Sequence, residues 1–395
     1  MPIWLEWFMW VIFVAFTPAG AWVSADGPRP TEPLVPASVI KLDLPPTEIA
    51  DAAFSPDGSL LATGDHGGEL TLWDTKDGRL RRKLRPKMPI RDFNELLDHD
   101  PAYRHWPLVP VVFDSSGKTI ATSTDWGLEI ADPDPPTMSL HFDALGSSIE
   151  VWRVEDGRKL ATIDTSRISI EALAFEPSGG RVVAINSRSQ ASIWEIDTGR
   201  RLLRFGKREV DDLMFLNGWS LSAIAVDHAA RHAASVLHKV NALPSEQKLR
   251  LWDYKTRTLR IIDSRVGFGP DPIEFGAVTF SPDGRVVAAA AYDRTIRLID
   301  FDTAKPTAML AIDDGFAQSR LAYRPDGRQL VAVNDEGEAR AYDIATKGLI
   351  WSAKGVPGRV RAIYWSGERV LIACGGLQLE KVEPMTLYTL VVPGP

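Results

Sequence analysis

The sequence predicts an all-β protein, a seven-bladed β-propeller built from four-stranded antiparallel blades. An apolar strand-turn-strand unit recurs seven times between residues 52 and 374. Each unit is followed by an alternating strand that ends in an aromatic or aliphatic residue, and then by a second turn signal. Because one such sheet cannot bury both of its faces, neighbouring sheets must stack around an axis and close into a ring.

The seven units share an apolar strand, a turn and a second apolar strand. They are AAFSPDGSLLATG (52–64), VVFDSSGKTIATS (111–123), LAFEPSGGRVVAI (173–185), LMFLNGWSLSAIA (213–225), VTFSPDGRVVAAA (278–290), LAYRPDGRQLVAV (321–333) and AIYWSGERVLIAC (362–374). The third strands that follow them end at Trp73, Trp152, Trp194, Trp252, Ile299, Tyr342 and, weakly, Val382. Each blade is thus expected to hold four short strands.

The turn chemistry explains why the same letters recur. A proline presets φ at the second turn position of three units, at Pro56, Pro282 and Pro325. A glycine then supplies the left-handed conformation that closes the turn, at Gly58, Gly284 and Gly327. We therefore assign these three glycines a structural role. The second hairpin turn is marked by Asp77-Gly78-Arg79, Asp156-Gly157-Arg158 and Asp197-Thr198-Gly199-Arg200.

The strings FSPDG, LLATG and LTLWD in unit one resemble the WD-repeat β-propeller family, in a diverged, bacterial-type form. The resemblance covers nearly everything from Ser38 onward. It implies that Asp293 and Thr295 in AAAAYDRTIRLID brace the turn between the second and third strands of blade five. No unit has the family's Gly-His pair, so the resemblance implies the fold and not a particular partner.

The stretch AYDIATKGLIW (341–351) resembles a second motif, the tryptophan-docking motif of quinoprotein propellers. Ala341, Asp343, Thr346 and Trp351 are in register with it, although the family's Gly-Lys is here Lys347-Gly348. In that family the motif packs blades together and does not hold the quinone. This resemblance therefore implies a propeller and no cofactor.

A ring of blades must join its two ends. SVIKLDL (38–44) alternates as an outer strand should, and we favour it as the strand that completes blade seven, by resemblance to the family. LYTLVVP (387–393) competes for the same place. The propeller is expected to span residues 38–395.

The N-terminal 25 residues are far more apolar than the rest and are expected to lie outside the fold. The apolar run from Trp7 to Phe16 is short for a membrane span, and Val23-Ser24-Ala25 offers small residues for a signal peptidase. We predict export, with cleavage after Ala25, to a secreted or periplasmic location. An uncleaved membrane anchor through residues 4–23 remains an alternative, as does a misassigned start or a cytosolic segment, because Glu6 stands where a basic residue is expected. Residues 26–37 read as a Pro-rich spacer.

Composition and motifs exclude several classes of function. The formal charge of -7 and the lack of a basic stripe beyond RLRRKLRPK (79–87) argue against nucleic acid. The single cysteine, Cys374, excludes paired-cysteine chemistry and reads as a buried core residue. The sequence contains no HExxH, GxSxG, Walker or CxxC motif. We therefore predict no cofactor, no assigned metal and no catalytic residue.

Three long insertions interrupt the even spacing, at residues 85–110, 124–148 and 227–247. We place the first between blades one and two, and the others between the second and third strands of blades two and four. Because successive strands are antiparallel, these joints open on the same side of the disc. Long loops on a rigid scaffold commonly carry recognition, so this side is expected to be the working face.

All seven histidines fall in segments assigned to that side: His66, His99, His105, His141, His228, His232 and His238. Residues 229–240 contain no helix breaker and read as a short helix, with His228 and His232 one turn apart. Such a pair can ligate a metal with a nearby carboxylate, but ordinary loop histidines are the favoured interpretation.

The sequence therefore predicts a monomeric, non-catalytic platform that binds another protein. Its expected anchors are the loop aromatics Tyr103, Trp106, Trp126 and Phe142, with the loop residues His105, His141, His228 and His232. Local packing of these side chains onto the disc is the alternative. Two other functions remain open: an exported propeller enzyme, metal-dependent or quinoprotein-like, with a site over the central channel, and a membrane-tethered adaptor.

Overall fold

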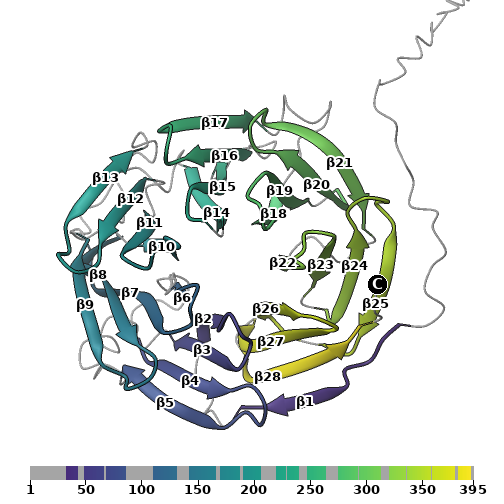
Figure 1. Ribbon diagram of the computed structural model, residues 1–395, viewed down its shortest axis with the longest axis horizontal. Helices are drawn as coiled ribbons and strands as arrows, with labels where there is room; N and C mark the ends of the chain where they lie inside the picture. The colour runs from purple at the N-terminus through teal and green to yellow at the C-terminus, as the bar shows by residue number, and fades with distance from the viewer. Residues whose placement is uncertain are drawn as a thin grey trace, which may run out of the picture.

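The protein is a ring of seven sheets around a central axis (Figure 1). The computed structural model describes residues 33–42, 49–65, 68–85, 110–130, 142–165, 170–186, 190–205, 219–227, 229–239, 247–263, 275–291, 293–312, 320–334, 336–356, 358–378 and 381–392. These residues form 28 strands in seven four-stranded antiparallel sheets and contain no helix. None of them therefore belongs to a helix that could cross a membrane. The predicted seven-bladed propeller is confirmed.

Blades one to three follow the sequence order from the axis outward. Blade one is β2 (Ile49–Phe54), β3 (Leu60–Asp65), β4 (Leu70–Asp74) and β5 (Leu80–Arg85). Blade two is β6 (Val111–Phe113), β7 (Thr119–Ile130), β8 (Phe142–Arg153) and β9 (Lys159–Asp164). Blade three is β10 (Ile170–Phe175), β11 (Arg181–Asn186), β12 (Ala191–Glu195) and β13 (Arg201–Phe205).

Blades four to six repeat this order, and blade seven completes the ring. Blade four is β14 (Trp219–Val226), β15 (His232–Lys239), β16 (Gln247–Asp253) and β17 (Thr258–Asp263). Blade five is β18 (Phe275–Phe280), β19 (Val286–Ala291), β20 (Thr295–Asp300) and β21 (Lys305–Ala311). Blade six is β22 (Arg320–Tyr323), β23 (Gln329–Val333), β24 (Glu338–Asp343) and β25 (Leu349–Lys354). Blade seven is β26 (Val360–Ser366), β27 (Arg369–Gln378), β28 (Lys381–Val391) and β1 (Ser38–Lys41).

The ring closes through its N-terminal strand. β1 pairs antiparallel with β28, from Ser38 opposite Thr389 to Lys41 opposite Thr386, and is the outer strand of blade seven. The expected closure by residues 38–44 is confirmed for the four residues of β1. The competing assignment is wrong, because residues 387–391 lie in β28, the third strand.

The residues just before β1 also contact the disc. The backbone N–H of Leu34 donates to the carbonyl of Ser352 at 2.7 Å, and the carbonyl of Leu34 accepts from the N–H of Lys354 at 3.0 Å. Leu34 thereby forms a parallel bridge to Ala353 on the outer strand of blade six. Residues 33–37, the last part of the predicted Pro-rich spacer, are docked across blades six and seven, because the edge of β25 supplies hydrogen-bond partners.

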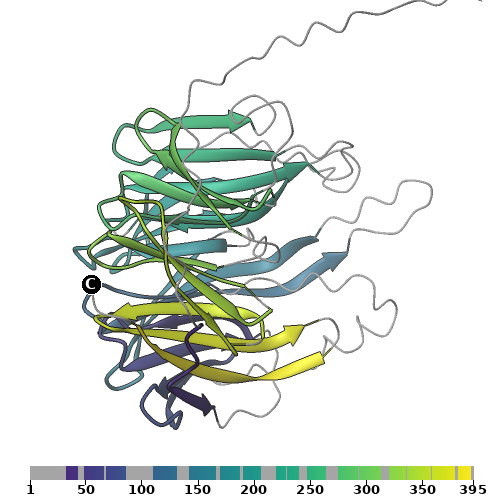
Figure 2. The same cartoon turned by 90° about the vertical axis from the view of Figure 1, so that its right-hand side faces the viewer.

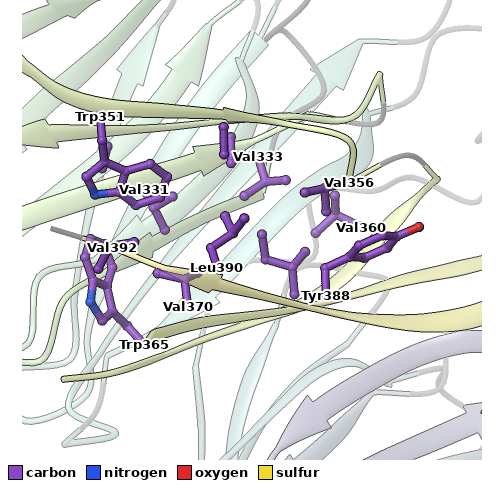
Figure 3. Close-up of a cluster of buried hydrophobic side chains, with 14 of the residues drawn as sticks. Val331, Val333, Trp351, Val356, Val360, Trp365, Val370, Tyr388, Leu390 and Val392 are labelled. Atoms are coloured by element: carbon purple, nitrogen blue, oxygen red, sulfur yellow. The ribbon is translucent and has the colours of Figure 1, made fainter. Parts of the chain in front are cut away.

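One buried apolar cluster fills each of the seven boundaries between blades. The residue near the end of each third strand packs on the preceding blade: Trp73 on blade seven, Trp152 on blade one and Trp194 on blade two. Figure 3 shows the cluster between blades six and seven, where Trp351 meets Trp365 edge-on with ring centroids 6.1 Å apart. Cys374 belongs to this cluster and is 1% exposed, so the predicted buried core role is confirmed.

Blade seven corrects one sequence assignment. Trp73 pairs with the second residue of the preceding strand, Leu61, and the same position in blade seven is Leu390, which pairs with Val370. Val382 was predicted for this position and is wrong. β28 has 11 residues and Val382 lies near its start, eight residues before the packing residue Leu390.

Blade four differs most from the sequence expectation. Residues 229–240 were predicted as a helix, but His232–Lys239 is strand β15. Unit four was read as a hairpin at 213–225, whereas 219–226 is a single strand, β14. The described residues of segment 227–247, predicted as an insertion, are consequently a tight turn, the second strand of the blade and the first residue of β16. Pairing with β14 and β16 on both sides overrides the helical preference of HAASVLHK.

The turn of blade four has no glycine and works differently from the others. Gly58, Gly284 and Gly327 have φ of 70°, 72° and 74°, the left-handed conformation that their turns need. Ala230 takes the same position in blade four with φ of 49°, and its N–H donates to the carbonyl of Asp227 at 2.9 Å. The Asp227 carboxylate accepts from the N–H groups of Arg231 and His232 at 2.6 and 2.8 Å, which stabilises this strained turn.

Candidate binding face

Strand polarity divides the disc into two faces. The turns between the first and second strands and between the third and fourth strands open on one side, which we call the turn face. The joints between second and third strands, and from each fourth strand to the next blade, open on the other side, the connection face. On the turn face, successive strands are joined by short hairpin turns, such as 55–59 and 114–118.

The innermost strands share a β-bulge near the connection face. In blades one, three, four, five and seven the pairing with the second strand skips one residue at the same position. The skipped residues are Ala50, Glu171, Ser222, Gly276 and Arg361. A bulge changes the direction of the side chain that it carries, and bulges are frequent beside binding sites.

A charged cluster, Asp51, Arg320 and Arg361, lies at this end of the inner strands and is called the axis cluster here. Arg361 is 4% exposed, and its guanidinium donates to the carbonyls of Ala50 at 2.8 Å and Gly375 at 3.0 Å. Asp51 accepts from the N–H of Val111 at 3.0 Å, and Arg320 Nη2 lies 3.9 Å from its Oδ1. The cluster thus connects blades six, seven, one and two.

Burial raises the pKa of Asp51 above its ordinary value, against the effects of Arg320, the Val111 amide and Arg361. The carboxyl group is therefore held where ionisation is costly. Sequence spacing could not reveal this cluster, because its members come from three different blades.

A second charged network lies where blades one and two meet. Glu150 on β8 is 6% exposed; its Oε2 lies 3.3 Å from Arg85 Nε and its Oε1 lies 3.0 Å from Lys159 Nζ. Arg85 also donates to the carbonyl of Gly68 at 3.0 Å. Next along the same pair of strands, the hydroxyls of Thr124 and Ser148 are 2.8 Å apart. This network fixes the base of the long hairpin formed by β7 and β8.

The outer part of that hairpin projects from the connection face. β7 and β8 have 12 residues each, and their pairing continues to Ile130 opposite Phe142. The second strand of blade one ends at Asp65, the counterpart of Thr124. Asp125–Ile130 and Phe142–Ser147, called the ribbon below, therefore extend past blade one, as the blue strands in Figure 2 show. At about 3.4 Å per residue the ribbon reaches roughly 20 Å outward.

Blade seven is also extended on this face. β27 and β28 have 10 and 11 residues and pair as far as Gln378 opposite Lys381. Blade one therefore lies between two elongated hairpins that belong to blades two and seven. In the expected insertion 124–148, the described residues 124–130 and 142–148 extend β7 and β8, because their alternating residues continue the ladder.

The predicted anchors fall in different places. Trp126 and Phe142 lie in the ribbon, on β7 and β8. Tyr103, His105, Trp106, His141 and His228 lie outside the described residues, as does nearly all of the predicted insertion 85–110.

His232 was predicted on the working face, and this is wrong. It begins β15 and therefore lies on the turn face, where its Nδ1 is 3.3 Å from Asp227 Oδ2. Its ring stacks on Phe301 of blade five with centroids 4.1 Å apart. The pairing of His228 and His232 on one helix is excluded by the strand. Within the described ranges, no three His, Cys, Asp or Glu residues are grouped to hold a metal.

Asp293 and Thr295 lie at the joint between β19 and β20 on the connection face. The Thr295 hydroxyl donates to Asp293 Oδ1 at 2.7 Å, and Arg297 Nη2 donates to Asp293 Oδ2 at 2.6 Å. Arg297 is 4% exposed, so the aspartate neutralises a buried guanidinium as well as holding the turn.

Two segments of this chain, in blades one and five, match a known repeat family. Residues 42–74 and 271–300 match the family described as WD domain, G-beta repeat. These stretches cover most of blade one and the first three strands of blade five. The chain thus carries WD40 repeats in a seven-bladed propeller.

Three curated proteins share similarity with part of the chain. Telomerase protein component 1 is 26% identical over 167 residues in Rattus norvegicus and 27% identical over 167 residues in Mus musculus. Each match covers 39% of this chain and 6% of the relative. WD repeat-containing protein SL1-17 of Schistosoma mansoni is 26% identical over 179 residues, 45% of this chain and 55% of the relative. The chain therefore spans a small part of the first two relatives and about half of the third.

Proposed function

We propose that this WD40-repeat propeller is a non-catalytic platform that binds a protein partner through its connection face. The observation that most directly supports this proposal is that the two faces of the disc differ. The turn face presents short hairpin turns, whereas blades two and seven extend their central strands on the connection face alone. A rigid ring with elaboration on one side is suited to present a fixed recognition surface.

The axis cluster supports the same face. Its guanidinium and carboxylate groups lie beside the β-bulges of the inner strands, and Arg320 is exposed. Polar groups held by several blades offer fixed hydrogen-bond partners around an extended contact area.

The names of the relatives agree with a role in assembly. Two of them are named as a protein component of telomerase, and WD-repeat propellers in general act as protein-interaction scaffolds. We take from these relatives only the general class of function.

Site-specific photo-crosslinking on the full chain tests the proposal. A photoreactive phenylalanine is introduced at Leu128 or Arg359 on the connection face, and at the exposed Arg158 or Arg285 on the turn face as matched controls. In the host cell, protein crosslinks are expected from the first pair and not from the second. Crosslinks that form mainly from Arg158 and Arg285 would overturn the proposed face.

We further propose that residues 1–25 direct export, on the basis of their apolar run and the small residues that follow it. N-terminal sequencing of the protein recovered from an exporting host is expected to begin at Asp26. A chain that retains Met1 and stays with the membrane would support the anchored alternative, and one that retains Met1 in the cytosol would contradict both.

A further inference from the structure

A small cavity lies where blades two and three meet, beside the strand ends of the connection face. Its volume is about 10 Å³. Its lining includes one residue from the end of blade two and five from blade three: Thr165, Ala184, Gln190, Trp194, Arg201 and Arg204. A cavity of this size holds one particle about as large as a water molecule, so polyatomic anions such as phosphate are too large for it.

Two buried side chains bring polar atoms to this cavity. Trp194 is 6% exposed and Thr165 is 3% exposed. The indole N–H of Trp194 and the hydroxyl of Thr165 have no hydrogen-bond partner among the described residues. Because a buried donor without a partner is destabilising, both atoms favour a particle that accepts hydrogen bonds.

The charged side chains of the described lining are both cations. Arg201 Cζ lies 5.3 Å from the ring centroid of Trp194, and Arg204 Nη2 donates to the neutral amide oxygen of Gln190. Neither guanidinium forms an ion pair with a described carboxylate, and the described lining contains no Asp or Glu. Both arginines are exposed, which gives the cavity a path to solvent. An acceptor with negative charge is therefore preferred to a neutral one.

Other blades carry a glutamate where blade three has Gln190. The N–H of Glu69 donates to the capping carboxylate of Asp65 at 2.7 Å, and the N–H of Gln190 donates to the side chain of Asn186 at 2.9 Å. Glu338 of blade six makes the same contact with its own capping residue. These three residues are thus equivalent, and blade three alone of these three blades has a neutral side chain there.

The equivalent glutamates neutralise cations of the outer strands. Glu69 Oε1 lies 2.9 Å from Lys83 Nζ, and Glu338 Oε1 lies 3.3 Å from Lys354 Nζ. The strand register makes Arg204 the equivalent of Lys83. The glutamine of blade three therefore leaves Arg204 without the carboxylate that blade one supplies.

We propose that this cavity binds a small inorganic anion, a halide such as chloride, at the boundary between blades two and three. The ion accepts hydrogen bonds from the Trp194 indole and the Thr165 hydroxyl, and Arg201 and Arg204 balance its charge. Since Thr165 ends blade two and the other groups belong to blade three, the ion stabilises this boundary. The site is separate from the proposed partner-binding surface.

Water is the competing occupant. It matches the cavity in size and in hydrogen bonding, but it carries no charge for the two guanidinium groups to balance. Variants that change charge at constant size therefore separate the two occupants.

Chloride is the probe for the full chain. Thermal unfolding is followed in sodium chloride and, at equal ionic strength, in sodium gluconate, whose anion is too large for the cavity. Because an ion that binds the folded state alone raises the midpoint, the midpoint should rise with chloride concentration relative to gluconate. The line width in chloride NMR measures the affinity directly.

Three variants locate the site. Gln190→Glu keeps the size of the side chain and supplies the carboxylate found in blade one, so it should weaken chloride binding ~tenfold or more. Ala184→Ser places a hydroxyl in the cavity and should abolish the chloride dependence. Thr63→Ala is the matched control, because it removes a hydroxyl from blade one, where Glu69 is present; it should change chloride binding less than ~twofold.

Equal chloride dependence in the wild type and in Gln190→Glu would overturn the proposal, because the cavity would then hold water. A wild type whose midpoint is the same in chloride and gluconate would overturn it too. Crystals of the full chain soaked in sodium bromide give the position: an anomalous peak within hydrogen-bond distance of Trp194 Nε1 is expected. Peaks confined to surface residues would mean an adventitious ion only, and the proposal would fall.

Discussion

At the scale of single residues, two tryptophans in the same position have different partners. The indole N–H of Trp73 donates to the Thr63 hydroxyl at 2.9 Å. In blade three the residue at the position of Thr63 is Ala184, and the buried indole N–H of Trp194 has no hydrogen-bond partner in the described structure. A cavity of about 10 Å³ lined by Ala184, Ser192 and Trp194 leaves room for a hydroxyl group.

Ala184→Ser is therefore expected to raise the free energy of unfolding by about 1 kcal/mol, because it supplies the missing acceptor. Thr63→Ala is the matched control and should lower it by about 1–3 kcal/mol, since it leaves the buried Trp73 N–H unsatisfied. Chemical denaturation of both variants measures the two effects. A loss of stability in the serine variant would show that the cavity cannot accept the hydroxyl.

Asp51 gives a prediction that depends on pH. Burial raises its pKa in the folded state above 3.8, so its contribution to stability is present below the unfolded pKa and is lost as the pH rises through the folded pKa. Asp51→Asn should thus be more stable than the wild type at pH 7, and the difference should vanish below about pH 4.

Asp57 is the control of opposite sign. The Ser55 hydroxyl, 2.6 Å away, lowers the pKa of Asp57 below 3.8, so its contribution is present at neutral pH and lost as the pH falls through the folded pKa. Asp57→Asn should be less stable than the wild type at pH 7. Denaturation curves across pH compare the two variants, and a destabilised Asp51→Asn at pH 7 would contradict the assignment.

At the scale of elements, two glycine turns differ in what lies beside them. Gly284 and Gly327 both have φ above 70°, so any side chain is strained there. A Cβ on Gly284 would lie 2.7 Å from Asp227 Oδ2 of blade four, whereas on Gly327 the nearest atom, in Pro282, is 3.7 Å away.

Gly327→Ala is expected to cost about 1–2 kcal/mol from backbone strain alone. Gly284→Ala should cost clearly more, because it also displaces the 2% exposed Asp227 from the cap of the blade four turn. Thermal unfolding of the two variants side by side measures the difference. Equal losses would mean that the turn of blade five does not depend on its contact with blade four.

The same turns show how far sequence reasoning reaches. A glycine in the first hairpin turn, with a proline before it in some units, located six blades, because each of these residues has one physical role in a hairpin. The first turn of blade four was misplaced in the sequence, because Asp227 and Ala230 build this turn without proline or glycine. The stretch LNGWS resembles a hairpin turn and was taken for it. The Ala-rich β15 of blade four resembles VVAAAA of β19, where small residues fit a strand packed on both faces, and that likeness was the available signal.

Sequence reasoning predicted only part of the candidate site. Trp126 and Phe142 were predicted as anchors in a loop at 124–148, and the structure places both residues on the strands of a long hairpin. The axis cluster had no sequence signature, because Asp51, Arg320 and Arg361 meet only when the ring closes.

At the scale of the whole molecule, closure depends on one short N-terminal strand. β1 pairs with β28 through four residues, and Leu34 adds two backbone hydrogen bonds to blade six. This stretch therefore connects the outer strands of blades six and seven to the start of blade one.

Two truncations separate closure from the preceding sequence. A chain that starts at residue 33 retains every described contact and should unfold at the midpoint of the full chain. A chain that starts at residue 43 exposes the edge of β28 and should lose several degrees in midpoint, because a ring with an open edge loses a boundary strand. Differential scanning calorimetry compares them. Equal midpoints would show that blade seven is stable with three strands.

The central claim is that partner recognition occurs on the connection face around blades seven, one and two. Hydrogen exchange on the full chain, with and without the protein recovered by crosslinking, tests it most directly. Slower exchange is predicted at the outer ends of β7, β8, β27 and β28, with no change in the turns at 55–59, 281–285 and 324–328. Protection of those turns, with the elongated hairpins unchanged, would contradict the account.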